Sequence, residues 1–349
     1  MRILLVMDPY IPVPPRHYGG IERVVADLAN ALVARGHDVT LWAAPGSSAD
    51  GRVEPFGREQ EWTAWSNVRN TLTLSSRFLT RRGEFDVVHN FGRLAYLLPI
   101  ARGRVAKVQT YMRPVNPKNM QTFERIGARA LVYTAVSHAI KATGAPGGGD
   151  WRVVYNCARA EKYTVSLNVD ARTAPLLFLA RLERCKGAHS AVTVARATGR
   201  RLIVAGNVST VPWERDYYER ELKPLFTDPL VDYVGPVDDA RKIELLQTSA
   251  ALLTPIEWDE PFPVTLPESL LCGTPVITFR RGGTPEGIDH GVTGFVCDTV
   301  DAMNRAVEEL ATIDRARCRS EAEKRFTEQV ITSAYEAIYH ELTARRAAA

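Results

Sequence analysis

The sequence predicts an α/β protein with two doubly wound, Rossmann-like domains that face a central cleft, for three reasons. Short apolar runs alternate with helical patterns, which favours parallel sheets covered by helices on both faces. The alternation fades between residues 161 and 173, where we place a linker, and then starts again. The length of 349 residues is enough for two domains with full hydrophobic cores.

The first domain is predicted over residues 1–165 and opens with a β-α-β unit. An apolar strand at 2–7 is followed by a helix whose apolar residues, from Ile21 to Val33, recur at helical spacing. Gly36 is a suitable end for that helix, and the next strand is predicted at 38–43. Further strands are predicted at 85–90, 107–112, 130–137 and 151–156, with a turn-rich loop at 144–150.

The second domain is predicted over residues 166–327 and repeats the alternation. Its strands are expected at 176–182, 201–206, 231–237, 251–256, 275–279 and 294–298. Its helices are expected at 188–199, 239–249 and 266–273. The last segment, 328–349, contains an amphipathic stretch that is predicted to pack back on the first domain.

Charge and cysteine content exclude some functions. A net charge of +4 is too small to indicate nucleic acid. Between Ser66 and Ala130, however, twelve Lys and Arg face three Asp and Glu, which could serve an anionic acceptor, peripheral membrane contact or merely a solvated surface. Five scattered cysteines indicate reduced thiols in a cytoplasmic protein and no zinc site. The N-terminus is too short for a signal peptide, and no run reaches the roughly 20 apolar residues of a membrane span.

Candidate ligand contacts lie just after predicted strands, where open α/β sheets bind ligands. Gly19 and Gly20 precede a helix and would let its amides approach an anion, although such a pair is more often a turn. Arg181 follows a strand and Lys186 precedes a helix. Converging cations suit a diphosphate, and two surface cations in a loop are the alternative.

Two glutamates bracket the stretch EPFPVTLPE, Glu260 to Glu268. Glu260 precedes a predicted helix and Glu268 lies inside it, so sequence closeness does not make them an acid/base pair. Carboxylates accept hydrogen bonds from hydroxyl groups, and we interpret the pair as contacts to two parts of one elongated, sugar-containing ligand. The loop at 280–298 is rich in glycine, which allows a backbone approach to a ligand.

Together these pieces resemble the retaining glycosyltransferases of family 4, which have the fold called GT-B. The matching segments, in chain order, are GGIE, GHDV, FDVVH, VVYNCARAEKY, ARLERCKG, VGPVDD, EPFPVTLPE and YEAIYHEL. They span nearly the whole chain. The resemblance implies a hexosyltransferase that uses a nucleotide-diphosphate sugar as co-substrate, with UDP favoured over GDP, and needs no other cofactor. No D-x-D sequence is present to carry a metal, which agrees with metal independence.

The resemblance also implies roles for individual residues. The catalytic residues would be Glu260, Arg181 and Lys186. The donor diphosphate would be held by Gly19, Gly20, Arg181, Lys186, Val264 and Thr265. Glu268 would bind the ribose, and Glu260, Pro261 and Phe262 the transferred sugar. Candidate acceptor contacts, for a hydroxyl group of a glycan, glycolipid or small molecule, are Arg16, His17, His89, Met112 and Arg113.

Three departures from the family pattern keep alternatives open. Pro263 stands where the family usually has glycine and removes a backbone N–H near the phosphates. Met112 and Phe91 stand where histidines are frequent. The alternatives are a non-catalytic nucleotide-sugar-binding protein and a nucleotide-sugar epimerase of the same fold. The sequence predicts neither the sugar, the acceptor nor an oligomeric state.

Overall fold

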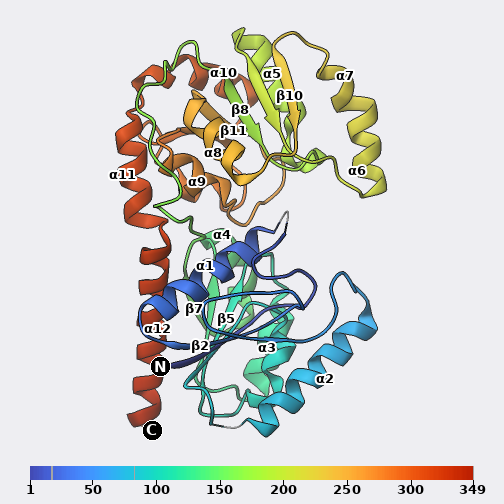
Figure 1. Cartoon of the computed structure of the whole chain (residues 1–349), viewed down its shortest axis with the longest axis vertical. Helices are drawn as coiled ribbons and strands as arrows, with labels where there is room; N and C mark the ends of the chain where they lie inside the picture. The colour runs from blue at the N-terminus through green and yellow to red at the C-terminus, as the bar shows by residue number, and fades with distance from the viewer. Residues whose placement is uncertain (17–18, 82, 349) are drawn as a thin grey trace. The chain divides into compact units, whose positions relative to one another are not determined.

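The computed structural model describes residues 1–16, 19–81 and 83–348. The chain forms two compact units. Unit 1 comprises Met1–Cys157 and Glu328–Ala349, and unit 2 comprises Ala158–Thr327. Each unit is a parallel sheet with helices packed around it (Figure 1), so the predicted α/β class with two Rossmann-like domains is confirmed.

Unit 1 is built on a seven-stranded sheet in the order β3-β2-β1-β4-β5-β6-β7. All of its strand pairs are parallel, and Val6 of β1 lies between Trp42 of β2 and Asn90 of β4. Residues Ile3 to Val6 are fully buried, as expected for a central strand covered on both faces. The strands are β1 (Arg2–Val6), β2 (Asp38–Ala43), β3 (Arg52–Pro55), β4 (Val87–Asn90), β5 (Ala106–Tyr111), β6 (Leu131–Ala135) and β7 (Asp150–Val153).

The helices of unit 1 include one that we did not predict, α2. It begins after a capping box in which Thr63 and Ser66 exchange hydrogen bonds. Its buried face is Ser66, Asn70, Leu74 and Phe78, half of it polar, so the apolar period of a helix is hidden in the sequence. The helical segments are α1 (Gly20–Ala34), α2 (Ala64–Thr80), η1 (Leu94–Ile100), α3 (Pro117–Arg125), α4 (His138–Gly144), η2 (Ala145–Gly147) and α12 (Glu328–Ala348).

Helix α12 packs on unit 1 although it lies at the far end of the chain (Figure 1). It contacts α1 and β5. The hydroxyl group of Tyr339 meets Nδ1 of His89 at 2.6 Å, and Glu336 pairs with Arg35 and His37. The C-terminal segment is therefore part of the core of unit 1.

Unit 2 has a six-stranded parallel sheet in the order β10-β9-β8-β11-β12-β13. Its strands are β8 (Leu176–Leu179), β9 (Leu202–Ala205), β10 (Val231–Gly235), β11 (Ala251–Thr254), β12 (Val276–Phe279) and β13 (Gly294–Cys297). Its longer helices are α5 (Ala188–Thr198), α8 (Asp239–Thr248), α9 (Thr265–Leu271), α10 (Val300–Glu308) and α11 (Arg315–Arg325). Shorter segments are η3 (Arg184–Lys186), α6 (Pro212–Tyr217), η4 (Tyr218–Leu222), α7 (Lys223–Leu225), η5 (Thr284–Gly287) and η6 (Leu310–Thr312).

The segment that we expected to be the linker, 161–173, lies inside unit 2. The division between the units falls earlier, between Cys157 and Ala158. Two arginines of α11 explain the difference, because they bind the backbone of the segment. Arg319 donates to the carbonyl oxygens of Ala160 and Tyr163, and Arg315 donates to that of Ser166 at 2.6 Å. The segment has no helical or strand period, yet tertiary contacts fix it.

Candidate active site

In unit 2 the strands β8 and β11 are neighbours at the centre of the sheet. The strand order changes direction between them, because the strands that follow each one are added toward opposite edges of the sheet. From β8 the sheet grows through β9 to β10, and from β11 it grows through β12 to β13. Doubly wound sheets bind ligands beyond the strand ends at such a point. Arg181 and Lys186 follow β8, and Glu260 and Glu268 follow β11, so the fold collects all four predicted residues at this edge.

Lys186 is positioned by the glycine that follows it. Gly187 has φ +76° and caps α5 in the left-handed conformation. A Cβ atom there would lie 1.9 Å from the carbonyl oxygen of Pro255, just after β11. Only glycine therefore allows the loop after β8 to approach the end of β11 so closely. The approach brings Lys186 toward the residues that follow β11.

Lys186 and Glu260 form a buried ion pair. Their side chains are 7% and 13% exposed, and the ammonium group binds Oε2 of the carboxylate. The indole N–H of Trp258 donates to the same oxygen, and the ammonium lies 5.4 Å from the centre of the Trp258 ring. The sequence predicted Lys186 at a diphosphate and Glu260 at a sugar. The structure joins these two residues directly and adds Trp258, which we did not predict.

The glycine-rich loop after β12 packs against the backbone of Glu260. Gly282 has φ +54°, and a Cβ atom there would lie 2.3 Å from the carbonyl oxygen of Glu260. The amide of Gly283 donates to that same oxygen at 2.7 Å. The sequence predicts that these glycines approach a ligand through their backbone. Their close approach is instead to the backbone of Glu260.

Arg181 has a carboxylate partner as well. Its Nη1 lies 2.5 Å from Oε1 of Glu183, whose side chain is 10% exposed, whereas that of Arg181 is 34% exposed. The hydroxyl group of Ser209 donates to the same oxygen at 3.4 Å. Glu183, which the sequence reasoning missed, therefore orients the guanidinium group while leaving it accessible at the strand end.

The segment between the two glutamates divides into buried and accessible parts. Pro261 and Phe262 are buried, and the Phe262 ring packs 5.4 Å from that of Phe326. The side chain of Phe262 is therefore a core contact, which leaves only its backbone for the predicted contact with the sugar. Val264 and Thr265 are half-buried at the start of α9, where the first amides have no acceptor within the helix.

Glu268 lies in the first turn of α9 and is 4% exposed. Its Oε1 accepts hydrogen bonds from the hydroxyl group of Tyr163 and from Nζ of Lys242, both at 2.5 Å. Neither partner was predicted. A signal for Tyr163 was present, because the segment that ends with it resembles a family pattern ending in Phe, and only the tyrosine carries a donor.

In unit 1 the growth of the sheet reverses between β1 and β4. Gly19 caps α1 near this point, and a Cβ atom there would lie 2.7 Å from Oε2 of Glu22. Gly20 is the first residue of α1. Arg16 is exposed and pairs with Glu59 at 3.4 Å, and His17 lies outside the described residues. The buried carboxyl group of Glu22 therefore adjoins the Gly-Gly turn where we predicted an anion.

A second group of polar residues at this edge was missed by the sequence reasoning. Asp8 follows β1 and accepts a hydrogen bond from the hydroxyl group of Tyr96 at 2.9 Å. Arg93, after β4, lies 4.0 Å from Asp8, and Arg113 follows β5 and is exposed. Burial raises the pKa of Asp8 and of Glu22, and the positive charge of Arg113 opposes part of both rises. Arg113 thus lies near two partly desolvated carboxyl groups.

His89 and Met112 belong to the interior of unit 1. His89 is fully buried, and its two ring nitrogens meet the hydroxyl groups of Tyr339 and Thr110, each at 2.6 Å. Desolvation holds the pKa of His89 well below its usual value. Met112 is 9% exposed. Both were candidate acceptor contacts, and we do not retain His89 because its polar atoms already have partners in the core.

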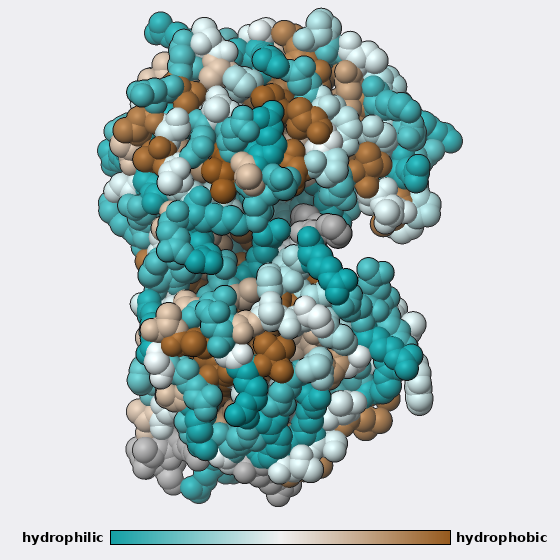
Figure 2. All heavy atoms as spheres, viewed as in Figure 1, coloured by the Kyte–Doolittle hydropathy of each residue, from teal (hydrophilic) through white to brown (hydrophobic). Residues whose placement is uncertain are grey.

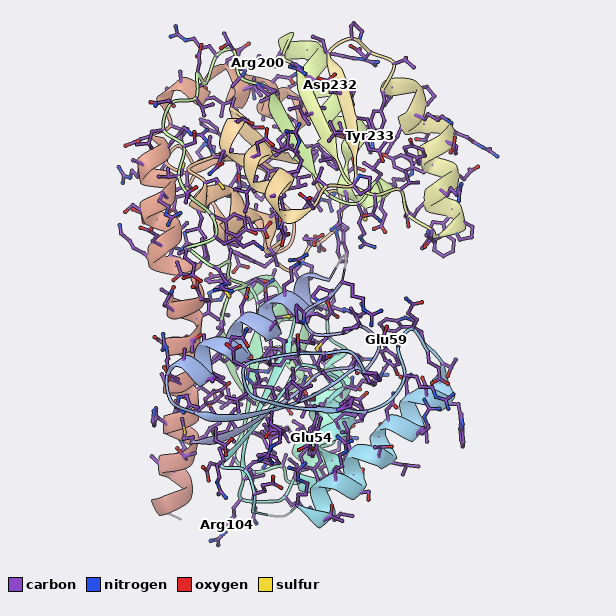
Figure 3. All side chains as sticks on the ribbon, in the orientation of Figure 1. Glu54, Glu59, Arg104, Arg200, Asp232 and Tyr233 are labelled. Atoms are coloured by element: carbon purple, nitrogen blue, oxygen red, sulfur yellow. The ribbon has the colours of Figure 1, made fainter. Side chains whose placement is uncertain are left out.

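The basic segment 66–130 does not form one free cationic surface. Lys107 is fully buried, donates to the carbonyl oxygens of Gly103 and Val105, and has its pKa lowered by desolvation to about 8. Arg81 contacts Glu54, which Figure 3 labels in unit 1, and its guanidinium lies over the Trp42 ring.

Figure 2 shows apolar side chains at the surface of α2. Within the described residues no helix is long and apolar enough to cross a bilayer.

Two parallel α/β units, with paired cations and carboxylates at the strand ends, define a protein suited to a phosphorylated ligand rich in hydroxyl groups. Comparison with known families makes this specific. The family model "Glycosyltransferase Family 4" matches residues 18–162, and "Glycosyl transferases group 1" matches residues 160–328. The chain therefore belongs to the glycosyltransferases of the group 1 and family 4 type with the GT-B fold, and it is an enzyme of that class.

Several proteins are similar over most of the chain. A glycogen synthase of Mycobacterium tuberculosis is 26% identical, over 90% of this chain and 86% of its own length. AviGT4, a glycosyltransferase involved in avilamycin A biosynthesis, has a TM-score of 0.73 and 27% identity, over 98% of each chain. HepE of Anabaena, solved with UDP and glucose, has a TM-score of 0.75 at 18% identity and covers 98% of this chain and all of its own. The last shows likeness of fold alone.

Proposed function

We propose that the protein is a retaining, metal-independent hexosyltransferase that moves a sugar from a UDP-sugar to a hydroxyl group of an acceptor. One observation carries the proposal: Lys186, which follows β8, and Glu260, which follows β11, form a largely buried ion pair, and the exposed Trp258 donates to the same carboxylate oxygen. Arg181 follows β8 as well. Such a group offers cations to a leaving diphosphate and a carboxylate to sugar hydroxyls. UDP is favoured by the complexes of HepE with UDP, UDP and glucose, and UDP-glucose.

The proposed chemistry follows the charge that develops. Breaking the bond between the anomeric carbon and the diphosphate leaves positive charge on the sugar and negative charge on the phosphates. Lys186 uses one N–H for Glu260, and its other donors can stabilise the phosphates together with Arg181. Glu260 holds a sugar hydroxyl, and its negative charge favours the developing cation. In this scheme the acceptor oxygen attacks from the face that the diphosphate leaves, and the hydroxyl proton passes to the departing diphosphate oxygen. The anomeric configuration is therefore kept.

The amides at the start of α9 are proposed to complete the diphosphate contacts. Val264 and Thr265 contribute their N–H groups, whereas Pro263 has none. Glu268 is assigned to the ribose. Gly19 and Gly20 stay predictions for the same phosphates.

On the acceptor side we propose Arg113 together with Asp8. Asp8 accepts a hydrogen bond from Tyr96, and it follows β1 at the point where the strand order of unit 1 changes direction between β1 and β4. A carboxyl group in that position can accept a hydrogen bond from an acceptor hydroxyl and so orient it.

The test is a panel of UDP- and GDP-sugars incubated with purified protein, with and without EDTA. We expect slow hydrolysis of one UDP-sugar that survives EDTA, and release of the sugar with its anomeric configuration retained, as followed by NMR. Loss of turnover in EDTA contradicts metal independence, and inversion contradicts the retaining mechanism. Tight nucleotide binding without turnover of any donor would favour a non-catalytic binding protein, and conversion of the donor sugar to an epimer would favour an epimerase.

A further inference from the structure

The hydrogen bonds of Glu268 fall on only one of its two carboxylate oxygens. Tyr163 and Lys242 both donate to Oε1, each at 2.5 Å. Within the described part of the chain, Oε2 receives no hydrogen bond. The side chain as a whole is 6% exposed. An oxygen that no protein donor occupies, on a carboxylate whose other oxygen is held twice, is free to accept a hydrogen bond from a ligand.

We propose that Tyr163 and Lys242 are positioning residues that fix Glu268 so that its Oε2 reads the ribose hydroxyl groups of the donor nucleotide. The inference rests on the proposed function. It adds that the enzyme selects ribonucleotides over deoxyribonucleotides, and it names the two residues that make the selection possible.

Two donors on one oxygen fix the orientation of the carboxylate plane. Tyr163 approaches from the segment before β8, and Lys242 approaches from α8, so the two donors arrive from different elements. The Lys242 ammonium also lies 5.5 Å from the centre of the Tyr163 ring, which ties the two donors to each other. With Oε1 held by both, rotation of the carboxylate would break two charge-assisted hydrogen bonds. Oε2 therefore keeps one direction.

The ring of Tyr163 is itself held in place by the rest of unit 2. It is 3% exposed. Arg319 of α11 binds the carbonyl oxygens of Tyr163, Ala160 and Leu271. Leu271 is the last residue of α9, the helix that carries Glu268. Arg319 therefore links the segment that contains Tyr163 to α9, which carries Glu268, and holds the two at a fixed separation.

Lys242 is held at this position by carboxylates on two sides, Asp239 and Glu268. Its Nζ lies 3.5 Å from Oδ1 of Asp239, and the other oxygen of Asp239 binds Lys162 at 2.6 Å. Lys162 precedes Tyr163 in the chain. Two cations and two carboxylates thus alternate from Lys162 to Glu268, so Lys242 can hold Glu268 without an unpaired charge.

The experiment measures binding of UDP, 2′-deoxy-UDP and 3′-deoxy-UDP by calorimetry, with GDP and its deoxy forms in parallel. The variants are Tyr163→Phe, which removes one donor and keeps the ring, and Lys242→Met, which removes the other. Because a hydrogen bond to a charged group contributes roughly tenfold or more in affinity, we expect each variant to bind the ribonucleotide roughly tenfold more weakly. Binding of the deoxy forms should change little, so the ratio between ribo and deoxy forms should shrink.

The matched controls are Tyr218→Phe and Lys223→Met, which alter the same residue types elsewhere in unit 2. Tyr218 packs against Phe226, and Lys223 forms an exposed pair with Glu219. Both controls should keep the wild-type ratio. An unchanged ratio in folded Tyr163→Phe or Lys242→Met overturns the inference, and either variant suffices if the other fails to fold. Failure of the wild-type protein to bind any of these nucleotides overturns the proposed function and the inference together.

Discussion

Replacement of Lys186 by methionine tests the centre of the site. Methionine keeps much of the length and apolar character of the lysine side chain but removes its ammonium group. Glu260 is then left 13% exposed with Trp258 as the remaining donor to its Oε2. Removing one partner of a buried ion pair costs about 3–5 kcal/mol, because the other charge stays buried and unpaired. With a total stability of about 5–15 kcal/mol, the variant should fold but melt at a lower temperature.

Turnover should fall for a separate reason. If Lys186 stabilises the leaving diphosphate, losing it removes about 3 kcal/mol of transition-state stabilisation, or about a hundredfold or more in rate. The double variant Lys186→Met with Glu260→Gln separates the two effects. It removes the unpaired charge, so it should recover stability without recovering turnover.

The assay combines urea unfolding with donor hydrolysis at saturating donor, and Lys223→Met serves as an exposed control with little expected effect. Near-normal turnover and nucleotide affinity in folded Lys186→Met would refute the placement of the diphosphate. Equal stability of the single and double variants would refute the account of the buried pair.

Three further predictions concern the supporting structure. Gly187→Ala should strongly lower both stability and turnover, because its Cβ would lie 1.9 Å from a carbonyl oxygen. The control Gly199→Ala has φ +62° and open space around its Cβ, so it should cost only about 1 kcal/mol of stability. Melting curves of the two variants test the difference. The lowered pKa of buried His89 means that the unfolded chain binds more protons below pH about 6.5, so stability should fall by up to about 1.4 kcal/mol per pH unit below that value. Replacing His89, but not exposed His340, should flatten this slope in urea titrations. Asp8→Asn should leave UDP binding and donor hydrolysis near normal and reduce transfer to an acceptor, and an equal loss of both reactions would contradict its assignment to the acceptor.

The regular elements were largely predictable because their signals are local. The strands at the centre of each sheet are continuous apolar runs, and α1 shows the helical period clearly. Helix α2 was not predicted, because Ser66 and Asn70 occupy its buried face. The expected linker was placed too late in the chain, because the contacts of Arg315 and Arg319 that fix it come from residues about 150 positions away.

For the site too, local signals in the sequence predicted one part, and only tertiary contacts decided the other. The sequence by itself determined which residue types follow which strands, because apolar runs and helical periods are local signals. It therefore predicted that Arg181, Lys186, Glu260 and Glu268 collect at one sheet edge, since parallel strands end at the same edge. Only the tertiary structure decided their partners. It paired Lys186 with Glu260, Arg181 with Glu183, and Glu268 with Tyr163 and Lys242, and it placed His89 in the core. Pairing depends on burial and on approach between distant segments, and no local pattern in the chain records either.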